Sequence, residues 1–233
     1  MLTGWHVYTI HPTGVTWEID LAKRLPDYTV QMMFDVGANE GQSALKYAEH
    51  HAEATIYSFE PIAETYRSLK ANTTGFSQVR CFRQAFGAEE GKAKMIKKEA
   101  TDRSSMKEHR KEDWEETIEV ERVPVRRVDQ FCKESGTDHI DLLKVDTEGH
   151  DMKVLEGASE MLDRQQIDFI QVEAGMSSIN TRHVPLEQVK SFLEQFGYFV
   201  FGIYDQCIEW PSQTMILRRV NVVFVLRRVA NGT

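Results

Sequence analysis

Short apolar runs alternate with segments of helical spacing along most of the chain. The mostly apolar run at 32–36 ends at Gly37, which is typical of a strand buried on both faces of a parallel sheet. Similar runs predict further strands, and the segments between them predict amphipathic helices. This alternating order predicts a doubly wound α/β fold. The strands are expected at 32–36, 55–60, 79–87, 139–146, 168–174, 198–204 and 221–226, and the main helices at 42–51, 64–73, 152–162 and 185–197.

Two segments depart from this alternation. Residues 1–30 combine a strand-like stretch at 5–10 with a possible short helix at 15–25, and we assign them to an N-terminal cap. Residues 88–128 are highly charged and then alternate between polar and apolar positions, which predicts a β-hairpin insertion with a mobile tip. The rest of 31–233 is expected to form one domain, because neither repeats nor a second domain are recognisable.

Composition limits the setting and the partners. The chain has 233 residues and a formal net charge of −8, which disfavours a nucleic-acid partner because phosphate binding requires a basic face. Its three cysteines lie too far apart to indicate a disulfide framework or a zinc site. We find no signal-peptide pattern at the N-terminus, and no apolar run reaches the roughly 20 residues that span a bilayer. A cytoplasmic protein without a membrane partner is expected.

The strongest motif is the loop Asp35–Gly41, between the first expected strand and the first helix. Its two glycines allow a tight turn and close approach of a ligand, and the N–H groups of a helix start favour an anionic group. The glycines are four residues apart, so the loop lacks the GxGxxG dinucleotide fingerprint. A ligand without a pyrophosphate is therefore expected, and the alternative is an ordinary turn between strand and helix.

Glu60 supplies the second signal, because it ends the second strand 19 residues after Gly41. An acid at this place in a doubly wound sheet hydrogen-bonds the hydroxyls of a ribose. The glycine loop and Glu60 together indicate an adenosine-containing cofactor at the carboxyl ends of the strands.

Charged residues also follow the fourth expected strand, in the block 143–150. Lys144 lies inside an apolar run, and a buried lysine requires a partner. Glu173 ends the fifth strand at a comparable height. The alternative to a catalytic block is a structural ion-pair cluster, with Asp146 or Thr147 capping the following helix.

These motifs resemble the FkbM family of class I S-adenosylmethionine-dependent methyltransferases. The resemblance is carried by DVGANEG, FEP, IDLLKVDTEGHDMKVLEGA and DFIQVEA, in register from about Met33 to Ala174. It implies a Rossmann-like, mostly parallel seven-stranded sheet with the last strand antiparallel, and usually O-methylation of a small molecule or sugar. The charged segment 97–117 and the N-terminal cap are least typical of the family, and substrate choice is expected to depend on them.

The resemblance also implies a set of cofactor contacts. The glycine loop should face the methionine part of S-adenosylmethionine, Glu60 the ribose and Gln84 the adenine, while Asp146 should stand between cofactor and acceptor. The residues expected to bind the cofactor are Asp35, Gly37, Ala38, Asn39, Gly41, Glu60, Pro61, Gln84, Ala85 and Asp146.

Methyl transfer requires an aligned nucleophile and, for a hydroxyl acceptor, a base. His150 is the leading base candidate because its ordinary pKa lies near neutrality, although a histidine there can also be a surface residue. The acids Asp146, Glu148 and Glu173 could instead gather Mg²⁺. The candidate catalytic residues are His150, Asp146, Glu148, Lys144 and Glu173.

Three other functions stay open from the sequence. An NAD-dependent dehydrogenase would also use Glu60 but lacks its glycine motif. A non-catalytic scaffold is expected to have lost the glycine loop or the ribose acid, and both are present. N-methylation of an amine or a protein remains an alternative. The sequence identifies neither the acceptor nor the oligomeric state.

Overall fold

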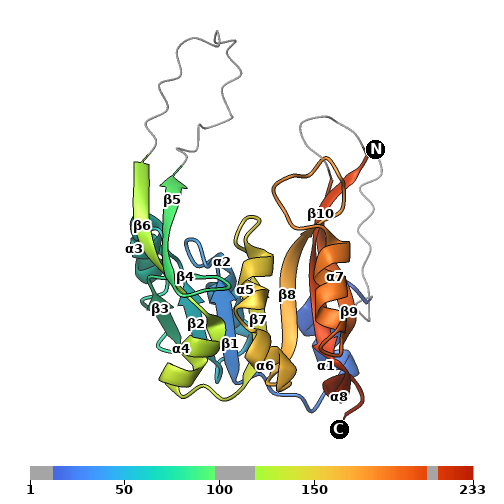
Figure 1. The fold of residues 1–233 in the computed structure, drawn as a ribbon. Coiled ribbons are helices and arrows are strands. Elements are labelled where there is room, and N and C mark those ends of the chain that lie inside the picture. Colours follow the sequence, from blue (N-terminus) through green and yellow to red (C-terminus); the bar gives the residue numbers. More distant parts are fainter. Residues whose placement is uncertain (1–12, 98–118, 209–214, 233) are drawn as a thin grey trace, which may run out of the picture.

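A seven-stranded sheet runs through the computed structural model, which describes residues 13–97, 119–208 and 215–232 (Figure 1). Its strand order is β3-β2-β1-β7-β8-β10-β9, and all neighbours from β3 to β8 are parallel. Strand β10 is antiparallel to both β8 and β9 and lies between them. The expected fold, with the last strand antiparallel, is confirmed. The strands are β1 Met32–Val36, β2 Thr55–Phe59, β3 Val79–Phe82, β7 Ile140–Val145, β8 Ile167–Gly175, β9 Tyr198–Ile208 and β10 Leu217–Leu226.

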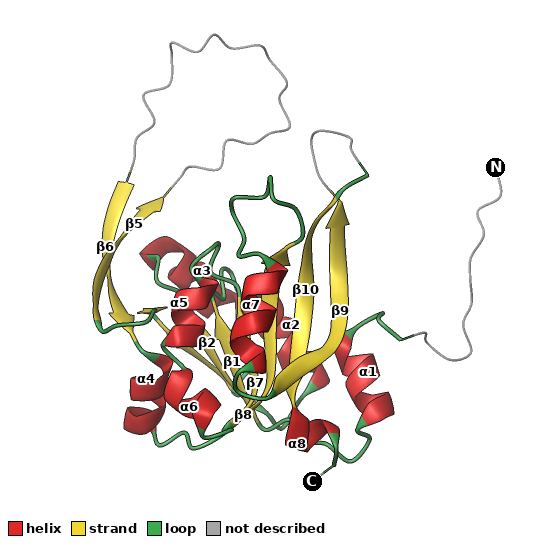
Figure 2. Ribbon diagram, turned by 45° about the vertical axis from the view of Figure 1, so that its right-hand side comes forward, coloured by secondary structure: helices red, strands yellow, loops and turns green. Residues whose placement is uncertain are grey.

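Helices cover both faces of this sheet. The chain moves in one direction from β1 to β3 and in the other from β7 to β9, so right-handed crossovers place the two sets of connecting helices on opposite faces. Figures 1 and 2 show α5 and α7 in front of the sheet and α2 and α3 behind it. None of the helices in the described ranges is long and apolar enough to cross a membrane. The helices are α1 Trp17–Arg24, α2 Gln42–His50, α3 Ala63–Asn72, α4 Val128–Ser135, α5 Asp151–Glu156, α6 Ser159–Asp163, α7 Leu186–Glu194 and α8 Arg227–Ala230.

The central strands form the core because both of their faces are covered. Every residue of β7 and β8 is buried, as the apolar runs predicted. Helix α1 confirms the short helix expected at 15–25, and the Thr16 hydroxyl caps it by accepting from the Ile19 N–H. Trp17 joins this helix to the core through ring contacts with Tyr47 of α2 and Phe169 of β8.

Two expected elements are broken in the structure. The strand expected at 79–87 leaves the main sheet after Phe82, because the next residues pair with another strand as β4, Ala85–Phe86. The helix expected at 152–162 is divided into α5 and α6 at Gly157. A Cβ on Gly157 would lie 2.2 Å from the Gly87 carbonyl oxygen, so only glycine fits at this break, where the two backbones pack closely.

A second, three-stranded sheet stands beside β3, in the order β4-β6-β5 (Figure 1). Strands β5 (Gly91–Lys97) and β6 (Glu119–Arg126) are antiparallel and lie within the insertion expected at 88–128. The expected mobile tip and the strand-like stretch at 5–10 lie outside the described residues.

Candidate functional site

The glycine loop lies at the carboxyl ends of the parallel strands. The N–H groups of Gly37 and Ala38 both donate to the Phe59 carbonyl at 3.0 Å, which folds the loop between β1 and β2. Gly37 has a φ of 81°, and a Cβ there would lie 1.9 Å from the Asp146 carbonyl oxygen. Only glycine therefore allows the loops after β1 and β7 to touch.

The same loop leads into an open helix start. Asn39 and Gly41 both adopt positive φ, and the Gly41 N–H donates to the Ala38 carbonyl at 2.8 Å. The N-cap of α2 is Gly41, and no side chain in the described part of the chain caps the first N–H groups of this helix. The positive end of the helix dipole is thus left available to an anionic ligand.

Glu60 lies directly after β2 and is only 7% exposed. Its Oε2 accepts from the Asn39 N–H at 3.1 Å and its Oε1 from the Ile62 N–H at 2.9 Å. Burial raises the pKa of this carboxyl by more than the two hydrogen bonds lower it, so the net pKa lies above its ordinary value. Because each carboxylate oxygen can accept more than one hydrogen bond, Glu60 retains the capacity to bind two hydroxyls.

The other residues expected on the adenosine side follow Glu60 and β3. Pro61 directly follows Glu60, and its carbonyl accepts from the Arg83 side chain. Gln84 lies between β3 and β4, and its Nε2 is buried without a hydrogen-bond partner among the described residues. Ala85 begins β4 and pairs with β6. A buried amide donor without a partner is rare in native proteins, so this N–H group is available to a ligand.

Lys144 is buried between two carboxylates. Asp35 on β1 lies opposite Lys144 on β7 in the parallel register, and the lysine Nζ is 3.1 Å from Asp35 Oδ1 and 3.3 Å from Asp146 Oδ2. Burial lowers the pKa of Lys144. The two carboxylates raise it by more than burial lowers it, so the net pKa lies above its ordinary value. The expectation that this lysine has a partner is confirmed. The second oxygen of Asp35, Oδ2, is buried without a partner among the described residues.

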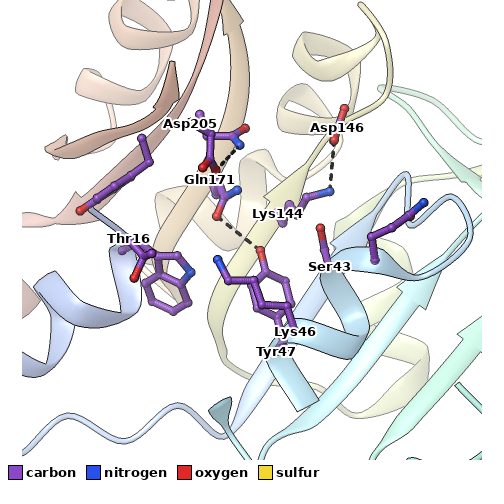
Figure 3. A pocket seen from close by; sticks show the side chains of 12 residues that line it. Thr16, Ser43, Lys46, Tyr47, Lys144, Asp146, Gln171 and Asp205 are labelled. Atoms are coloured by element: carbon purple, nitrogen blue, oxygen red, sulfur yellow. Dashed lines mark hydrogen bonds and ion pairs between the residues drawn. The ribbon is translucent and has the colours of Figure 1, made fainter. Parts of the chain in front are cut away.

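A cavity of about 240 Å³ opens beside this ion-pair cluster. Figure 3 shows Thr16, Gln171 and Asp205 toward one side of it and Ser43, Lys144 and Asp146 toward the other. Lys144 and Asp146 are the predicted site residues that line it. Among the described residues, the lining consists of Thr16, Trp17, Gln42, Ser43, Lys46, Tyr47, Lys144, Asp146, Gln171, Tyr204, Asp205 and Asn221.

The remaining candidate catalytic residues lie outside this cavity lining. His150 is exposed just before α5. Glu148 is exposed and forms an ion pair with Arg182. Both carboxylate oxygens of Glu173 are paired, one with Arg219 and the other with His183 Nε2 at 2.7 Å. The structure therefore assembles Asp35, Lys144 and Asp146 but not the wider acidic cluster.

The alternative in which Asp146 or Thr147 caps the following helix is wrong, because the N-cap of α5 is His150. Asp151, at the first position of α5, accepts from the N–H groups of Thr147 and Gly149 at 2.8 and 3.2 Å. Its carboxylate thus organises the loop after β7, whereas Asp146 is held by Lys144.

Sequence reasoning missed most of the cavity wall. Gln171 and Asn221 are polar residues inside apolar strand runs, so the argument that singled out Lys144 could also have found them. Trp17, Tyr47 and Tyr204 carry no such signal, because aromatic residues at these spacings are equally typical of a core.

The glycine loop, the acid after β2 and a cavity at the carboxyl edge of this sheet define a class I S-adenosylmethionine-dependent methyltransferase. The family profile described as methyltransferase FkbM domain matches residues 35–200, and the chain belongs to this family. The dehydrogenase and scaffold alternatives are thereby excluded.

Relatives agree with this class. The chain is 23% identical over 176 residues to the 2-O-methyltransferase NoeI of Sinorhizobium fredii, covering 71% of this chain and 72% of that protein. Among solved structures, it is similar to M. capricolum TrmK in complex with S-adenosylhomocysteine, with a TM-score of 0.50, 11% identity and coverage of 89% and 67%. The METTL16 methyltransferase domain gives a TM-score of 0.52, 11% identity and coverage of 90% and 64%. At these identities the two solved structures share the fold alone.

Proposed function

We propose that the protein transfers the methyl group of S-adenosylmethionine to a hydroxyl oxygen of a small molecule, with a sugar as the leading acceptor. The observation that carries this proposal is the cavity of about 240 Å³ beside Asp146, because its size suits a small acceptor better than a macromolecule. The name of the relative NoeI, a 2-O-methyltransferase, supports an oxygen acceptor.

The residues at the carboxyl edge fit the cofactor. Asp35 Oδ2 and Gln84 Nε2, both buried without partners in the described part of the chain, would accept from the methionine amino group and donate to the adenine. Glu60 would accept from the ribose hydroxyls. The open start of α2, with Ser43 lining the cavity, suits the methionine carboxylate.

The chemistry divides between cofactor and protein. When bound, S-adenosylmethionine supplies a methyl group that is already activated for transfer. Asp146 lines the cavity and contacts the glycine loop through its backbone, so it is placed to accept the proton of the acceptor hydroxyl. Lys144 stays protonated between Asp35 and Asp146 and keeps the Asp146 carboxylate in place.

A magnesium mechanism does not fit this site. Among the described residues, Asp146, Glu148 and Glu173 do not form a group whose oxygens converge. Glu148 is held by Arg182, and Glu173 by Arg219 and His183.

Binding of the cofactor provides the first prediction. Glu60→Ala should weaken S-adenosylhomocysteine binding about tenfold or more, because hydrogen bonds to a charged group contribute roughly 1.5–3 kcal/mol. Titration calorimetry measures this change, and the melting temperature without ligand checks the fold. Unchanged affinity would remove Glu60 from the ribose site.

The acceptor atom is tested with isotope-labelled methyl groups. The enzyme is incubated with methyl-labelled S-adenosylmethionine and a panel of glycosides and amines, and NMR distinguishes a methyl ether from a methylamine. We expect methyl ethers, with turnover reduced about a hundredfold or more in Asp146→Asn. Glu148→Gln, an acid of the same loop outside the cavity lining, is the matched control and should be near normal. Methylamine products alone would contradict O-methylation.

A further inference from the structure

Asp151 is a buried carboxylate that accepts its hydrogen bonds from the loop before it. This first residue of α5 is 1% exposed, and within the described ranges it forms no ion pair. Its Oδ1 accepts from the N–H and the hydroxyl of Thr147 at 2.8 and 2.9 Å, and its Oδ2 accepts from the Gly149 N–H at 3.2 Å. A buried charge requires such compensation, and hydrogen bonds to a charged group are stronger than neutral ones. Asp151 therefore holds this loop firmly.

The peptide bond between Asp146 and Thr147 is held at both of its polar groups. Its N–H donates to Asp151, and its carbonyl oxygen lies so close to Gly37 that a Cβ there would be 1.9 Å away. On the other side of Asp146, the N–H of this residue donates to the Val36 carbonyl at 3.0 Å. Because a peptide is planar, fixing its N–H and its carbonyl also fixes the direction in which the Asp146 side chain leaves the backbone.

A single ion pair among the described residues holds the Asp146 carboxylate itself. The side chain is 34% exposed, and one of its oxygens lies 3.3 Å from Lys144 Nζ. Figure 3 shows this contact beside the cavity as a dashed line. The same ammonium is shared with Asp35, at 3.1 Å. One shared ion pair leaves the carboxylate free to rotate about it, so its direction also depends on the backbone.

The turn that follows Asp146 depends on Asp151 as well. Glu148 and Gly149 adopt φ values of 54° and 99°, and this left-handed region is unfavourable for a glutamate. The hydrogen bonds from Thr147 and Gly149 to Asp151 lie on either side of Glu148 and hold the turn in this conformation. Loss of the Asp151 carboxylate should therefore release the turn and displace Asp146.

We infer that Asp151 is a positioning residue for methyl transfer. It acts through the peptide between Asp146 and Thr147 and keeps the Asp146 carboxylate directed into the cavity, where this carboxylate accepts the proton of the acceptor hydroxyl. Asp151 itself does not line the cavity. The inference rests on the proposed function, because that function gives Asp146 its part as the base.

A double-mutant cycle on turnover tests this role. Asp151→Asn keeps the shape of the side chain but replaces one accepting oxygen by an amide group that only donates. Turnover of the methyl glycoside that wild type methylates fastest should fall about tenfold to a hundredfold, because misplacing a reacting group by about 1 Å can cost a hundredfold. In an Asp146→Asn background the same change should cost less than about twofold, because no carboxylate remains to be positioned. The matched control is Asp163→Asn, which changes an exposed aspartate at the end of α6.

A second cycle requires no acceptor. Calorimetry measures the ratio of the dissociation constant of S-adenosylhomocysteine to that of S-adenosylmethionine, which falls when a carboxylate moves away from the positive sulfonium. Asp151→Asn should lower this ratio about threefold in wild type and leave it unchanged in Asp146→Asn. Thr147→Val removes a hydroxyl donor but no charge, so it should lower turnover and the ratio by about twofold each. This variant replaces Asp151→Asn in both cycles if the melting temperature shows that Asp151→Asn does not fold.

The outcomes separate positioning from a purely structural part. An effect of Asp151→Asn that disappears in the Asp146→Asn background supports the inference. Equal effects in both backgrounds would mean that Asp151 acts through its own charge or through stability, and normal turnover at a lowered melting temperature would leave it a structural part alone. Either result would overturn the inference. Failure to form a methyl ether from any glycoside would overturn the proposed function instead, and the calorimetric cycle would still decide whether Asp151 positions Asp146.

Discussion

At the scale of single residues, the net charge around Lys144 should set the relative affinities of the site for S-adenosylmethionine and S-adenosylhomocysteine. Asp35 and Asp146 contribute two negative charges and Lys144 one positive charge, all within hydrogen-bonding distance. The net charge of −1 is neutralised by the sulfonium of S-adenosylmethionine but not by neutral S-adenosylhomocysteine. Removing charges one at a time should therefore change the preference between the two ligands.

The prediction concerns the ratio of the dissociation constant of S-adenosylhomocysteine to that of S-adenosylmethionine. Lys144→Met makes the cluster more negative and should raise this ratio roughly tenfold at the effective dielectric of a partly buried site. Asp146→Asn should lower it, and the double variant should return near the wild-type ratio. Calorimetry measures all four proteins, with Lys153→Met, an exposed lysine paired with Glu156, as the control. A ratio that does not follow the charge of the cluster would refute this role.

Single residues also show what sequence can predict. Lys144 stood out because a lysine inside an apolar run requires a partner, and the pair with Asp35 follows from the register of two adjacent parallel strands. The exposure of His150 could not be predicted in the same way. It depends on where α5 begins, and Asp151 determines this through its bonds to the preceding loop.

At the scale of elements, Glu173 holds the segment between β8 and α7 against the carboxyl end of β8. The carboxylate pairs with His183, within that segment, and with Arg219 on β10. Gly175 and Pro185 form a β-bridge where the segment leaves and returns. Both oxygens of Glu173 are engaged, so we propose a structural rather than a chemical part for this acid.

Glu173→Gln should therefore lower the free energy of unfolding by about 2–3 kcal/mol, because removing one charge leaves a largely buried pair uncompensated. The affinity for S-adenosylhomocysteine should not change. Urea denaturation measures the loss. Glu148→Gln is the matched control, since its ion pair with Arg182 is exposed and should contribute less than about 1 kcal/mol. Normal stability combined with lost methyl transfer in Glu173→Gln would argue for a direct role in the reaction.

Element boundaries were less predictable than element types. The segment 79–87 is expected as one strand that ends at Gly87, yet the chain changes sheets after Phe82 and pairs with β6, about 40 residues further on. Helix α5 ends before Gly157, where the Gly87 backbone packs too closely to admit a side chain. The change of sheet depends on a contact distant in sequence, which local periodicity does not contain.

At the scale of the whole molecule, strand order brings together the parts that build the cavity. Insertion of β10 between β8 and β9 places Asn221 next to β8 and opposite Tyr204 in the register with β9. Helix α1, from the N-terminal part of the chain, adds Trp17 to the cavity lining. The residues expected to bind the cofactor stand in or next to strand ends within a known motif, whereas the rest of the cavity lining has no such order along the sequence.

At the amino ends of β7 and β8, an ion-pair network links the segment before β1 with helix α8. Tyr28 donates its hydroxyl toward Asp141 and Asp168, at 2.8 and 2.6 Å. His139 Nε2 is 3.1 Å from Asp168, which also binds Arg228 of α8 at 2.6 Å. The hydrogen bond to Asp168 raises the pKa of His139. Burial raises the pKa of Asp168. Its hydrogen bonds to His139 and Tyr28 lower the pKa by more than burial raises it, so the net pKa is below the ordinary value.

These shifts predict how stability depends on pH. The raised pKa of His139 gives a contribution that is complete below its unfolded pKa of about 6.5 and is lost as pH rises through the folded value. The lowered pKa of Asp168 gives a contribution present above about pH 3.9 and lost as pH falls through its folded value. This network should therefore stabilise most between about pH 4 and 6.5. Melting temperatures between pH 5 and 8 should fall more steeply in wild type than in His139→Gln, with or without a chelator. Parallel profiles would exclude His139 as the titrating group, and a profile that a chelator alters would point to a bound metal ion instead of the ion pairs.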